Sequence, residues 1–427
     1  MIAATMANGL RPTRAELANG AVILAQESGT VPAVSINATF FAGSAQDPPA
    51  LPGVAYLTRR VIDRGAAHRS AVQIADALDD RGVSLRVSAA RDMFSVSCDC
   101  LSEDVNDLLA LIADIIREPL FPQAELDKRR IEAITSVRQD DDNPAVRSID
   151  TLVQTLYGAN HPYGRRFKGT AATLNSIRRE QLVEFHRRHL QPASLRLAIV
   201  GDIDPRAAVD SAAPLFEGWR GGPVNGEVHP APPMPGSRQV VREWMPGKTQ
   251  SDIGYGFTAI RRLDPRYYRY WMMNNILGQF GLGGRLADNI RERQGMAYYA
   301  YSTLEARVLE GPLIIRAGVD PANVERTLEA IDTEVAELGR TGPTVAEFED
   351  TRESLIGSIP RMLETNEGIG EFLLAAEQFG LGLDHDRRLP GLLRDVTLED
   401  VHEAAAELLD PSRASIVVAG PSENGRW

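Results

Sequence analysis

An internal repeat constrains the fold of this chain more than any other feature. The segment EQLVEFHRRHLQPASLRLAIVGD, residues 180–202, aligns without gaps with EDVHEAAAELLDPSRASIVVAGP, residues 399–421, at a constant offset of 219. Pro192 then meets Pro411, and apolar positions meet apolar positions on both sides. Each copy is typical of a helix, a proline that ends it and a buried strand. The chain therefore contains one structural unit written twice.

The repeat extends upstream with small gaps. Residues 101–130 run parallel to residues 320–354, and in both an acid-rich first turn precedes an amphipathic helix. The apolar residues at helical spacing are Val105, Leu108, Leu109, Ile112 and Ile116 in the first copy and Val324, Leu328, Ile331 and Val335 in the second. We interpret the two halves as homologous domains.

The sequence predicts where these domains begin and end. Residues 218–238 are so rich in Gly and Pro that neither a helix nor a central strand is expected there, which indicates a linker between domains 1–217 and 239–427. Each half has alternating strand patterns, then helices, then strands again. This order favours an α+β fold in which each domain is a mostly antiparallel β-sheet with helices packed on one face.

Charge and hydropathy exclude several classes of partner. The formal net charge of -12 argues against general binding to nucleic acid or to an anionic membrane, because both need clustered Lys and Arg. The longest apolar stretches, such as residues 108–116, are far shorter than the ~20 residues of a membrane-spanning helix. The first residues do not have the pattern of a signal peptide. We therefore expect a cytoplasmic protein, or a periplasmic one if the amino terminus has been trimmed.

Two segments add a family resemblance to the duplicated layout. HPYGRRFKGT at 161–170 and RLADNIRERQGMAYYAYS at 285–302 resemble pitrilysin-type (inverzincin) zinc peptidases, the family that includes the mitochondrial processing peptidase. The resemblance covers nearly the whole chain. It implies an inverted zinc motif, H-x-x-E-H, on a helix of the first domain, where two His hold the metal and the Glu activates a water molecule.

This chain lacks the residues of that motif. On GVAYLTRRVIDRG, residues 53–65, Tyr56 and Arg60 take the places of the two His, and Arg59 takes the place of the Glu. A guanidinium stays protonated and has no lone pair for a metal, and two adjacent cations repel Zn²⁺. The resemblance implies a third ligand near Ser136, where Glu132 is the nearest acid. The degenerate motif predicts no metal and no cofactor in this chain.

Other candidate ligands do not form a metal site in the sequence. His186 and His189 lie one helical turn apart, but the second copy of the repeat has alanine and leucine there, so the helix does not depend on them. The DHD at 384–386 adds one further His, and zinc needs three or four converging ligands. Cys98 and Cys100 fall on one face of a strand, together with apolar residues, and are expected in the core.

The second domain keeps a pair of residues that the resemblance associates with catalysis. IRERQGMAY contains Arg291 and Tyr298, on either side of Gly295. The resemblance implies that these side chains reach a neighbouring active site, hold the substrate carbonyl and stabilise the oxyanion formed when zinc-bound water attacks. The alternative is an exposed arginine at a helix end and a tyrosine packed in the core.

A glycine-rich segment, LGQFGLGGRL at 277–286, lies between two helical patterns. It does not match a dinucleotide-binding fingerprint, which requires G-x-G-x-x-G after a strand. The sequence alone is consistent with a flexible helix connection. The resemblance favours instead a loop that touches substrate, as in the zinc-less subunit of the processing peptidase.

These patterns lead to one functional hypothesis and two alternatives. The hypothesis is a zinc-less subunit, inactive alone, of a heterodimeric metallopeptidase that cleaves peptides. Its partner would be a homologous chain with an intact H-x-x-E-H and would hold the zinc, towards which Arg291 and Tyr298 would face. One alternative is a structural or assembly subunit, like the family members that serve as core proteins of respiratory complexes. The other is a homodimer with different hydrolytic chemistry, for which the chain offers neither G-x-S-x-G nor a Cys/His nucleophile.

Overall fold

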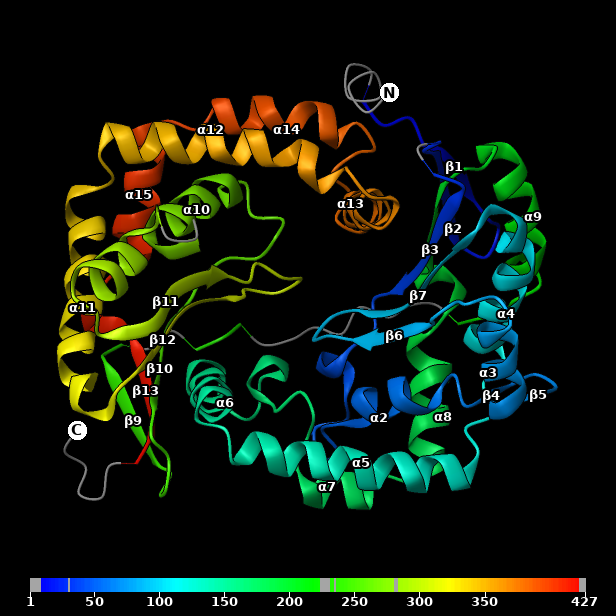
Figure 1. Cartoon of the computed structure of the whole chain (residues 1–427), viewed down its shortest axis with the longest axis horizontal. Coiled ribbons are helices and arrows are strands. Elements are labelled where there is room, and N and C mark those ends of the chain that lie inside the picture. Colours follow the sequence, from blue (N-terminus) through cyan, green and yellow to red (C-terminus); the bar gives the residue numbers. More distant parts are fainter. Residues whose placement is uncertain (1–8, 30, 223–230, 234–235, 280–282, 422–427) are drawn as a thin grey trace. The chain divides into compact units, whose positions relative to one another are not determined.

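The repeat is visible in the secondary structure. In the computed structural model (Figure 1), helix α8 (Arg179–His189) and strand β8 (Arg196–Gly201) have their counterparts in α15 (Leu398–Leu408) and β13 (Ser415–Gly420). Both counterparts begin and end 219 residues later, as the gap-free alignment predicts. The structure describes residues 9–29, 31–222, 231–233, 236–279 and 283–421.

Two sheets of matching topology form the framework. Their strand orders are β1-β2-β8-β3-β7-β6 and β11-β12-β10-β13-β9. Each has one parallel pair, β2–β8 in the first and β13–β9 in the second, and its other pairs are antiparallel. The remaining strands of the first sheet are β1 (Thr13–Glu16), β2 (Val22–Glu27), β3 (Ala33–Phe40), β6 (Arg86–Ala89) and β7 (Phe94–Leu101). Those of the second are β9 (Gln239–Trp244), β10 (Ser251–Thr258), β11 (Ala297–Leu304) and β12 (Pro312–Val319).

Both units combine these sheets with α-helices, so the α+β class predicted from the sequence is confirmed. They are α2 (Val54–Val61), α3 (Ala71–Asp79), α4 (Val105–Arg117), α5 (Gln123–Asp141), α6 (Pro144–Tyr157), α7 (Ala171–Ser176), α9 (Pro205–Glu217), α10 (Tyr267–Asn274), α11 (Val324–Thr341), α12 (Val345–Met362), α13 (Asn366–Gln378) and α14 (His385–Arg394). A short hairpin, β4 (Gly65–Ala66) and β5 (Arg69–Ser70), precedes α3. Within the described ranges, no helix combines the length and the apolar character that crossing a bilayer requires.

The first sheet is covered by helices on both faces. Along β2, Ile23 and Ala25 belong to the main core, which also contains residues of α4 and α9. Val22 and Leu24 alternate with them and pack with residues of α13. Figure 1 shows α13 on the side of this sheet away from α4 and α9. The sequence predicted helices on one face only. The second layer was missed because α13 lies far along the chain from the strands that it covers.

The second sheet is built in the same way. Gly254 and Gly256 of β10 face α6, whose Ile149, Leu152 and Leu156 side chains lie 3.1–3.3 Å from the positions that Cβ atoms on the two glycines would take. Tyr255, between them, points to the other face and donates its hydroxyl hydrogen bond to Asp332 of α11, at 3.0 Å. Because Gly254 and Gly256 have no side chains, α6 can approach the sheet closely.

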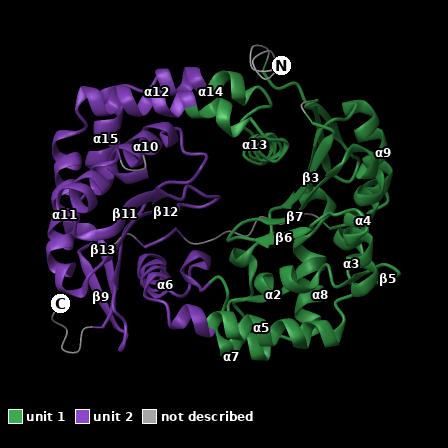
Figure 2. Ribbon diagram, in the orientation of Figure 1, with its two compact units in different colours: residues 1–137, 167–228, 358–389 green, residues 138–166, 229–357, 390–427 purple. Residues whose placement is uncertain are grey.

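The two compact units are interleaved along the chain (Figure 2). One contains residues 1–137, 167–228 and 358–389, and the other contains residues 138–166, 229–357 and 390–427. Helix α6 thus lies in the first half of the sequence but packs on the sheet of the second, and α13 does the converse. The unit containing residues 1–137 is called unit 1 below and the other unit 2. The sequence repeat and the folded units therefore do not have the same boundaries.

Candidate functional site

Helix α2 carries the degenerate motif in unit 1. Its first turn is held by Asp47, whose carboxylate accepts hydrogen bonds from the backbone N–H of Gly53 at 2.7 Å and of Ala55 at 2.8 Å. Gly53 has φ of 106°, a left-handed conformation that glycine adopts without strain. Tyr56 is buried, with only 1% of its surface exposed. These contacts fix the residue at which α2 begins, and they therefore fix where Tyr56, Arg59 and Arg60 lie on the helix.

Three cations surround the ring of Tyr56. The guanidinium carbons of Arg59 and Arg60 lie 4.7 and 5.6 Å from the ring centroid, and Lys168 Nζ lies 5.9 Å from it. Phe167 packs edge-on against the same ring, with centroids 5.7 Å apart. We call Arg59, Arg60 and Lys168 the cation cluster. Lys168 is 112 residues from Tyr56 in the sequence, so no local pattern could have indicated its place here.

Glu132 of α5 neutralises part of this charge. It accepts hydrogen bonds from Arg129, at 2.9 Å, and from Arg60, at 3.0 Å. The bonds from Arg129, and then those from Arg60, hold the pKa of Glu132 below its usual value, so that it is ionised at neutral pH. Ser136, one turn further along α5, accepts a hydrogen bond from Lys168 Nζ at 3.0 Å. Glu132, the acid nearest to the expected third ligand, is therefore already hydrogen-bonded to two arginines.

These residues do not fit a zinc ion. Neither arginine nor protonated lysine has a lone pair to donate, and the cations would repel a second positive charge at the same place. One phenol and one carboxylate already bound to arginine do not provide the three or four ligands that zinc requires. Over the ranges that the structure describes, no three His, Cys, Asp or Glu side chains are grouped so that they could hold a metal ion.

Unit 2 presents Arg291 and Tyr298 on two successive elements. Arg291 lies in a π-helix, Ala287–Arg293, and 45% of its side chain is exposed, with Nε 3.4 Å from a carboxylate oxygen of Glu292. π-Helical turns are rare, and they are frequent at functional sites. Gly295, with φ of 60°, ends this turn and leads into β11.

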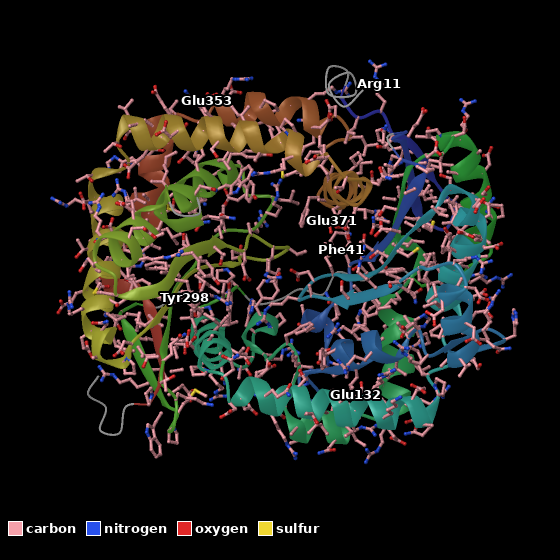
Figure 3. All side chains as sticks on the ribbon, viewed as in Figure 1. Arg11, Phe41, Glu132, Tyr298, Glu353 and Glu371 are labelled. Carbon is pink, nitrogen blue, oxygen red and sulfur yellow. The ribbon has the colours of Figure 1, made fainter. Side chains whose placement is uncertain are left out.

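A β-bulge places Tyr298 outside the sheet. Ala297 is opposite Val319 and Tyr299 is opposite Gly318, so Tyr298 is an extra residue on β11 with no partner on β12. Bulges re-aim side chains and occur frequently beside active sites. The side of β11 away from β12 is an edge of the sheet, where Figure 3 labels Tyr298. This residue is 82% exposed. The alternative in which this tyrosine packs in the core is thereby excluded.

Tyr299 fixes the bulge from the inner side. Its hydroxyl donates a short hydrogen bond to Asp252 of β10, which is 2% exposed and also accepts from Gln250 at 3.2 Å. The ring crosses β12 over Gly318, where a Cβ would lie only 2.6 Å from a ring carbon. Burial raises the pKa of Asp252 above its usual value, while the hydrogen bond from Tyr299 opposes this shift. Gly318 and Tyr299 therefore hold β11 in the conformation that exposes Tyr298, a role with no signal in the sequence.

Comparison with known proteins agrees with this architecture. Residues 22–170 match the family model "Insulinase (Peptidase family M16)", and residues 176–355 match "Peptidase M16 inactive domain". The chain belongs to the M16 family. The family resemblance seen in the sequence, which concerns the insulinase or pitrilysin type, is thus confirmed.

Relatives in this family extend over most of the chain. An uncharacterized zinc protease of Streptomyces coelicolor is 26% identical over 96% of this chain and 89% of its own length, and one of Bacillus subtilis is 26% identical over 92% and 97%. The crystal structure of a peptidase M16 inactive domain from Pseudomonas fluorescens is 28% identical, covers 97% of this chain and 98% of its own, and superposes with a TM-score of 0.90. A protease from Helicobacter pylori, 15% identical with a TM-score of 0.88 over 96% of this chain and 100% of its own, shares the fold.

The histidines that the sequence offered as ligands have structural roles in unit 1. His186 Nε2 lies 2.6 Å from the carbonyl oxygen of Ile116, and burial lowers its pKa. His189 packs against Phe185, with ring centroids 4.9 Å apart. In the DHD segment, His385 is buried against Phe372, and Asp386 accepts a hydrogen bond from the backbone N–H of Leu10 at 2.7 Å.

The cysteines and the glycine-rich segment complete the predicted features. Cys98 and Cys100 are buried free thiols on β7, as expected for core residues. In the glycine-rich segment, residues 277–279 end a π-helix, Asn275–Gln279, and a second π-helix begins at Ala287. Residues 280–282 lie outside the described residues.

Proposed function

We propose that this chain is the zinc-less subunit of a heterodimeric M16 metallopeptidase. In this proposal Arg291 and Tyr298 bind the scissile carbonyl and stabilise the oxyanion at the zinc site of a homologous partner with an intact H-x-x-E-H. The chain contributes no ligand and no general base, so it is inactive alone. Its substrates are peptides.

The exposed bulge residue Tyr298 carries this proposal. Leaving a tyrosine 82% exposed forgoes the burial of a large apolar ring, and the bulge leaves it without a partner on β12. Such an arrangement is expected where the hydroxyl must reach a ligand beyond the chain. Arg291, half exposed on the preceding π-helix, supplies a charged donor on the same unit.

Edge strands provide the surface on which a peptide would bind. The outer strands are β6 and β1 in the first sheet and β11 and β9 in the second. An extended peptide can add to such an edge through main-chain hydrogen bonds, which select for extension more than for sequence. Strand β11 combines such an edge with Tyr298, so the carbonyl of an added peptide would lie close to the donor.

Tyr298→Phe in the reconstituted pair tests the proposal. It removes one hydroxyl from an exposed ring, so the pair should assemble and the partner should keep its zinc, while turnover of a peptide falls by about 10²–10³. Arg291→Ala should also weaken substrate binding, because a charged donor positions the carbonyl before the attack. Arg291→Lys should restore activity only in part, because it keeps the charge but loses the planar fork.

Arg293→Ala is the matched control. Arg293 follows in the same π-helix, with 72% of its side chain exposed, and should be silent. Wild-type turnover in both Tyr298→Phe and Arg291→Ala would contradict the proposal and favour a structural or assembly subunit. Activity of this chain in the absence of any partner would contradict it as well.

A further inference from the structure

Strand β9 is the outer strand of the second sheet, but its counterpart in the first sheet is an inner strand. Both β2 and β9 pair in parallel with the strand of the repeat, which is β8 in one sheet and β13 in the other. In the first sheet β1 covers the other side of β2 in antiparallel register. Within the residues that the structure describes, the second sheet ends at β9 and lacks such a covering strand.

The sequence explains why the chain does not cover β9 in this way. At the distance at which β1 precedes β2, the segment that precedes β9 is residues 230–233, Pro-Ala-Pro-Pro. Proline has no backbone N–H, so this segment has a single donor for a strand ladder. A strand that covers β9 in the manner of β1 is therefore expected from another molecule.

The backbone groups on the open side of β9 belong to three of its residues. The N–H groups of Gln239, at the start of β9, and of Met245, which follows it, donate hydrogen bonds at 2.9 and 2.7 Å to carbonyl oxygens on the β13 side. Because backbone groups point to alternate sides along a strand, those of Val240, Arg242 and Trp244 point to the open side. Such a row of donors and acceptors is a template for pairing with another chain.

The side chains of these three residues lie on the face of β9 that α6 does not cover. Glu243 points to the α6 face, where it accepts hydrogen bonds from two side chains of that helix, both at 2.9 Å. On the other face, Val240 is 47% and Trp244 is 60% exposed, and Arg242 pairs with Glu325 of α11 at 3.1 Å. Outer strands that avoid pairing carry lysine, proline or a bulge, whereas β9 exposes a valine and a tryptophan.

The pattern of β9 is complementary to itself in an antiparallel arrangement. With Arg242 on a two-fold axis, the open backbone groups of one copy meet those of the other, and Val240 lies opposite Trp244 of the second copy. A β-branched residue opposite an aromatic ring is a favourable cross-strand pair. The two Arg242 side chains meet at the axis, where each copy also brings the carboxylate of Glu325, so the charges are complementary.

We propose that two copies of this chain pair through β9, in antiparallel register centred on Arg242, so that their second sheets become continuous. This inference is independent of the function proposed above. Strands β9 and β11 are opposite ends of one sheet, so Tyr298 stays accessible to a zinc-bearing partner. With that partner present, the assembly would contain two copies of each chain. The interface is a single pair of strands, so dimerisation should be reversible and should increase with concentration.

Cysteine cross-linking of the full-length chain tests the register. In Arg242→Cys the two new thiols lie opposite each other, with Cα atoms about 5.5 Å apart, which permits a disulfide. Oxidation should therefore convert this variant to a covalent dimer. In Trp244→Cys the two new thiols lie about 14 Å apart across the same axis, so no disulfide should form. Cys98 and Cys100 are buried and do not compete.

A mixture of two variants sharpens this test. Neither Val240→Cys nor Trp244→Cys should cross-link alone, because each has its identical position far from the axis. Mixed in equal amounts, the two variants should form a disulfide between unlike chains, since these positions lie opposite each other in the proposed register.

Sedimentation velocity of the wild-type chain over a series of concentrations measures the reversible dimer. Trp244→Lys should lower its association constant by about tenfold, because two aromatic cross-strand pairs are lost in each dimer and a charge is placed at the edge. Leu263→Lys is the matched control. Leu263 is an apolar residue of unit 2 that is 57% exposed outside β9, and its replacement should leave the association constant unchanged.

Each outcome supports or overturns the inference. A wild-type chain that stays monomeric at every concentration overturns it, and so does a dimer that Trp244→Lys leaves intact. Equal cross-linking of Arg242→Cys and Trp244→Cys would reflect collisions rather than register and would overturn it as well. Turnover by the reconstituted pair should be the same in Trp244→Lys as in wild type. Loss of that turnover would assign β9 to the homologous partner instead of a second copy. The tests of Tyr298 are unaffected by the first three outcomes.

Discussion

The outer strands β6 and β11 occupy equivalent places in the two sheets but differ in register. Strand β6 pairs with β7 without interruption, from Arg86 opposite Ser97 to Ala89 opposite Phe94. Between Ala297 and Leu304, β11 has one residue more than the segment of β12 with which it pairs, and that residue is Tyr298. One inserted residue therefore distinguishes a plain edge from one that presents a phenol.

The helices on the second faces show another difference. In unit 2, glycines on strand β10 make room for the side chains of α6. In unit 1 the glycine is on the helix, because Gly370 of α13 lies against Asn37 of β3, and Gln378 donates a hydrogen bond to Thr39 at 2.5 Å. Both units gain a close helix–sheet contact, but the small residue has changed sides. The duplicated topology therefore preserves the layers of helix and sheet, whereas the residues that make the individual contacts differ between the two units.

Removing the bulge should have the largest effect. A chain lacking Tyr298 would pair β11 with β12 in uninterrupted register, as β6 pairs with β7, and would present no phenol. We expect peptide turnover by the reconstituted pair to fall at least as far as in Tyr298→Phe, by about 10²–10³ or roughly 3–4 kcal/mol in activation free energy. Assembly and thermal unfolding would show that the pair still folds. Undiminished turnover would mean that the two edges are functionally alike.

Filling the space under α6 should have a moderate effect. In Gly254→Leu the new side chain would meet Ile149, Leu152 and the carbonyl oxygen of Ser148, so overpacking should lower the free energy of unfolding by about 1–3 kcal/mol. Urea unfolding followed by circular dichroism measures this change. Gly357→Ala, in the interior of α12 where nothing lies within 4 Å of the added Cβ, is the control and should stabilise the chain by about 0.5–1 kcal/mol. Unchanged stability in Gly254→Leu would show that α6 does not rely on the glycine.

The smallest effect concerns His186, whose counterpart in the second copy of the repeat is Ala405. Burial lowers the pKa of His186 in the folded chain, so the unfolded chain binds more protons as pH falls. Its contribution to stability is complete above the unfolded pKa of about 6.5 and is lost as pH falls from that value towards the lower pKa of the folded chain. The unfolding free energy of His186→Ala, measured in urea between about pH 7.5 and 5.5, should therefore depend less steeply on pH. His68→Ala, at an exposed position of unit 1, is the control, and an unchanged slope in His186→Ala would contradict the prediction.

Much of the fold could be predicted from the sequence because it is encoded locally. The helix, proline and strand of the repeat are set by apolar periodicity and by residues next to one another in the chain, so α8, β8, α15 and β13 follow from the alignment. Tyr56, Arg59 and Arg60 could be recognised as unable to hold zinc from their chemistry alone. Arg291 and Tyr298 were identified through the resemblance, and their catalytic roles remain a prediction.

Other features were decided only by the tertiary structure, because they depend on residues that are distant in the sequence. Periodicity shows which face of α6 or α13 is apolar but not which sheet that face will cover. The packing of α6 on the second sheet and of α13 on the first could therefore not be predicted. Lys168 joins Arg59 and Arg60 through the folding of a segment more than a hundred residues away. The exposure of Tyr298 depends on strand register, which the pairing of β11 with β12 and the crossing of Tyr299 over Gly318 determine together.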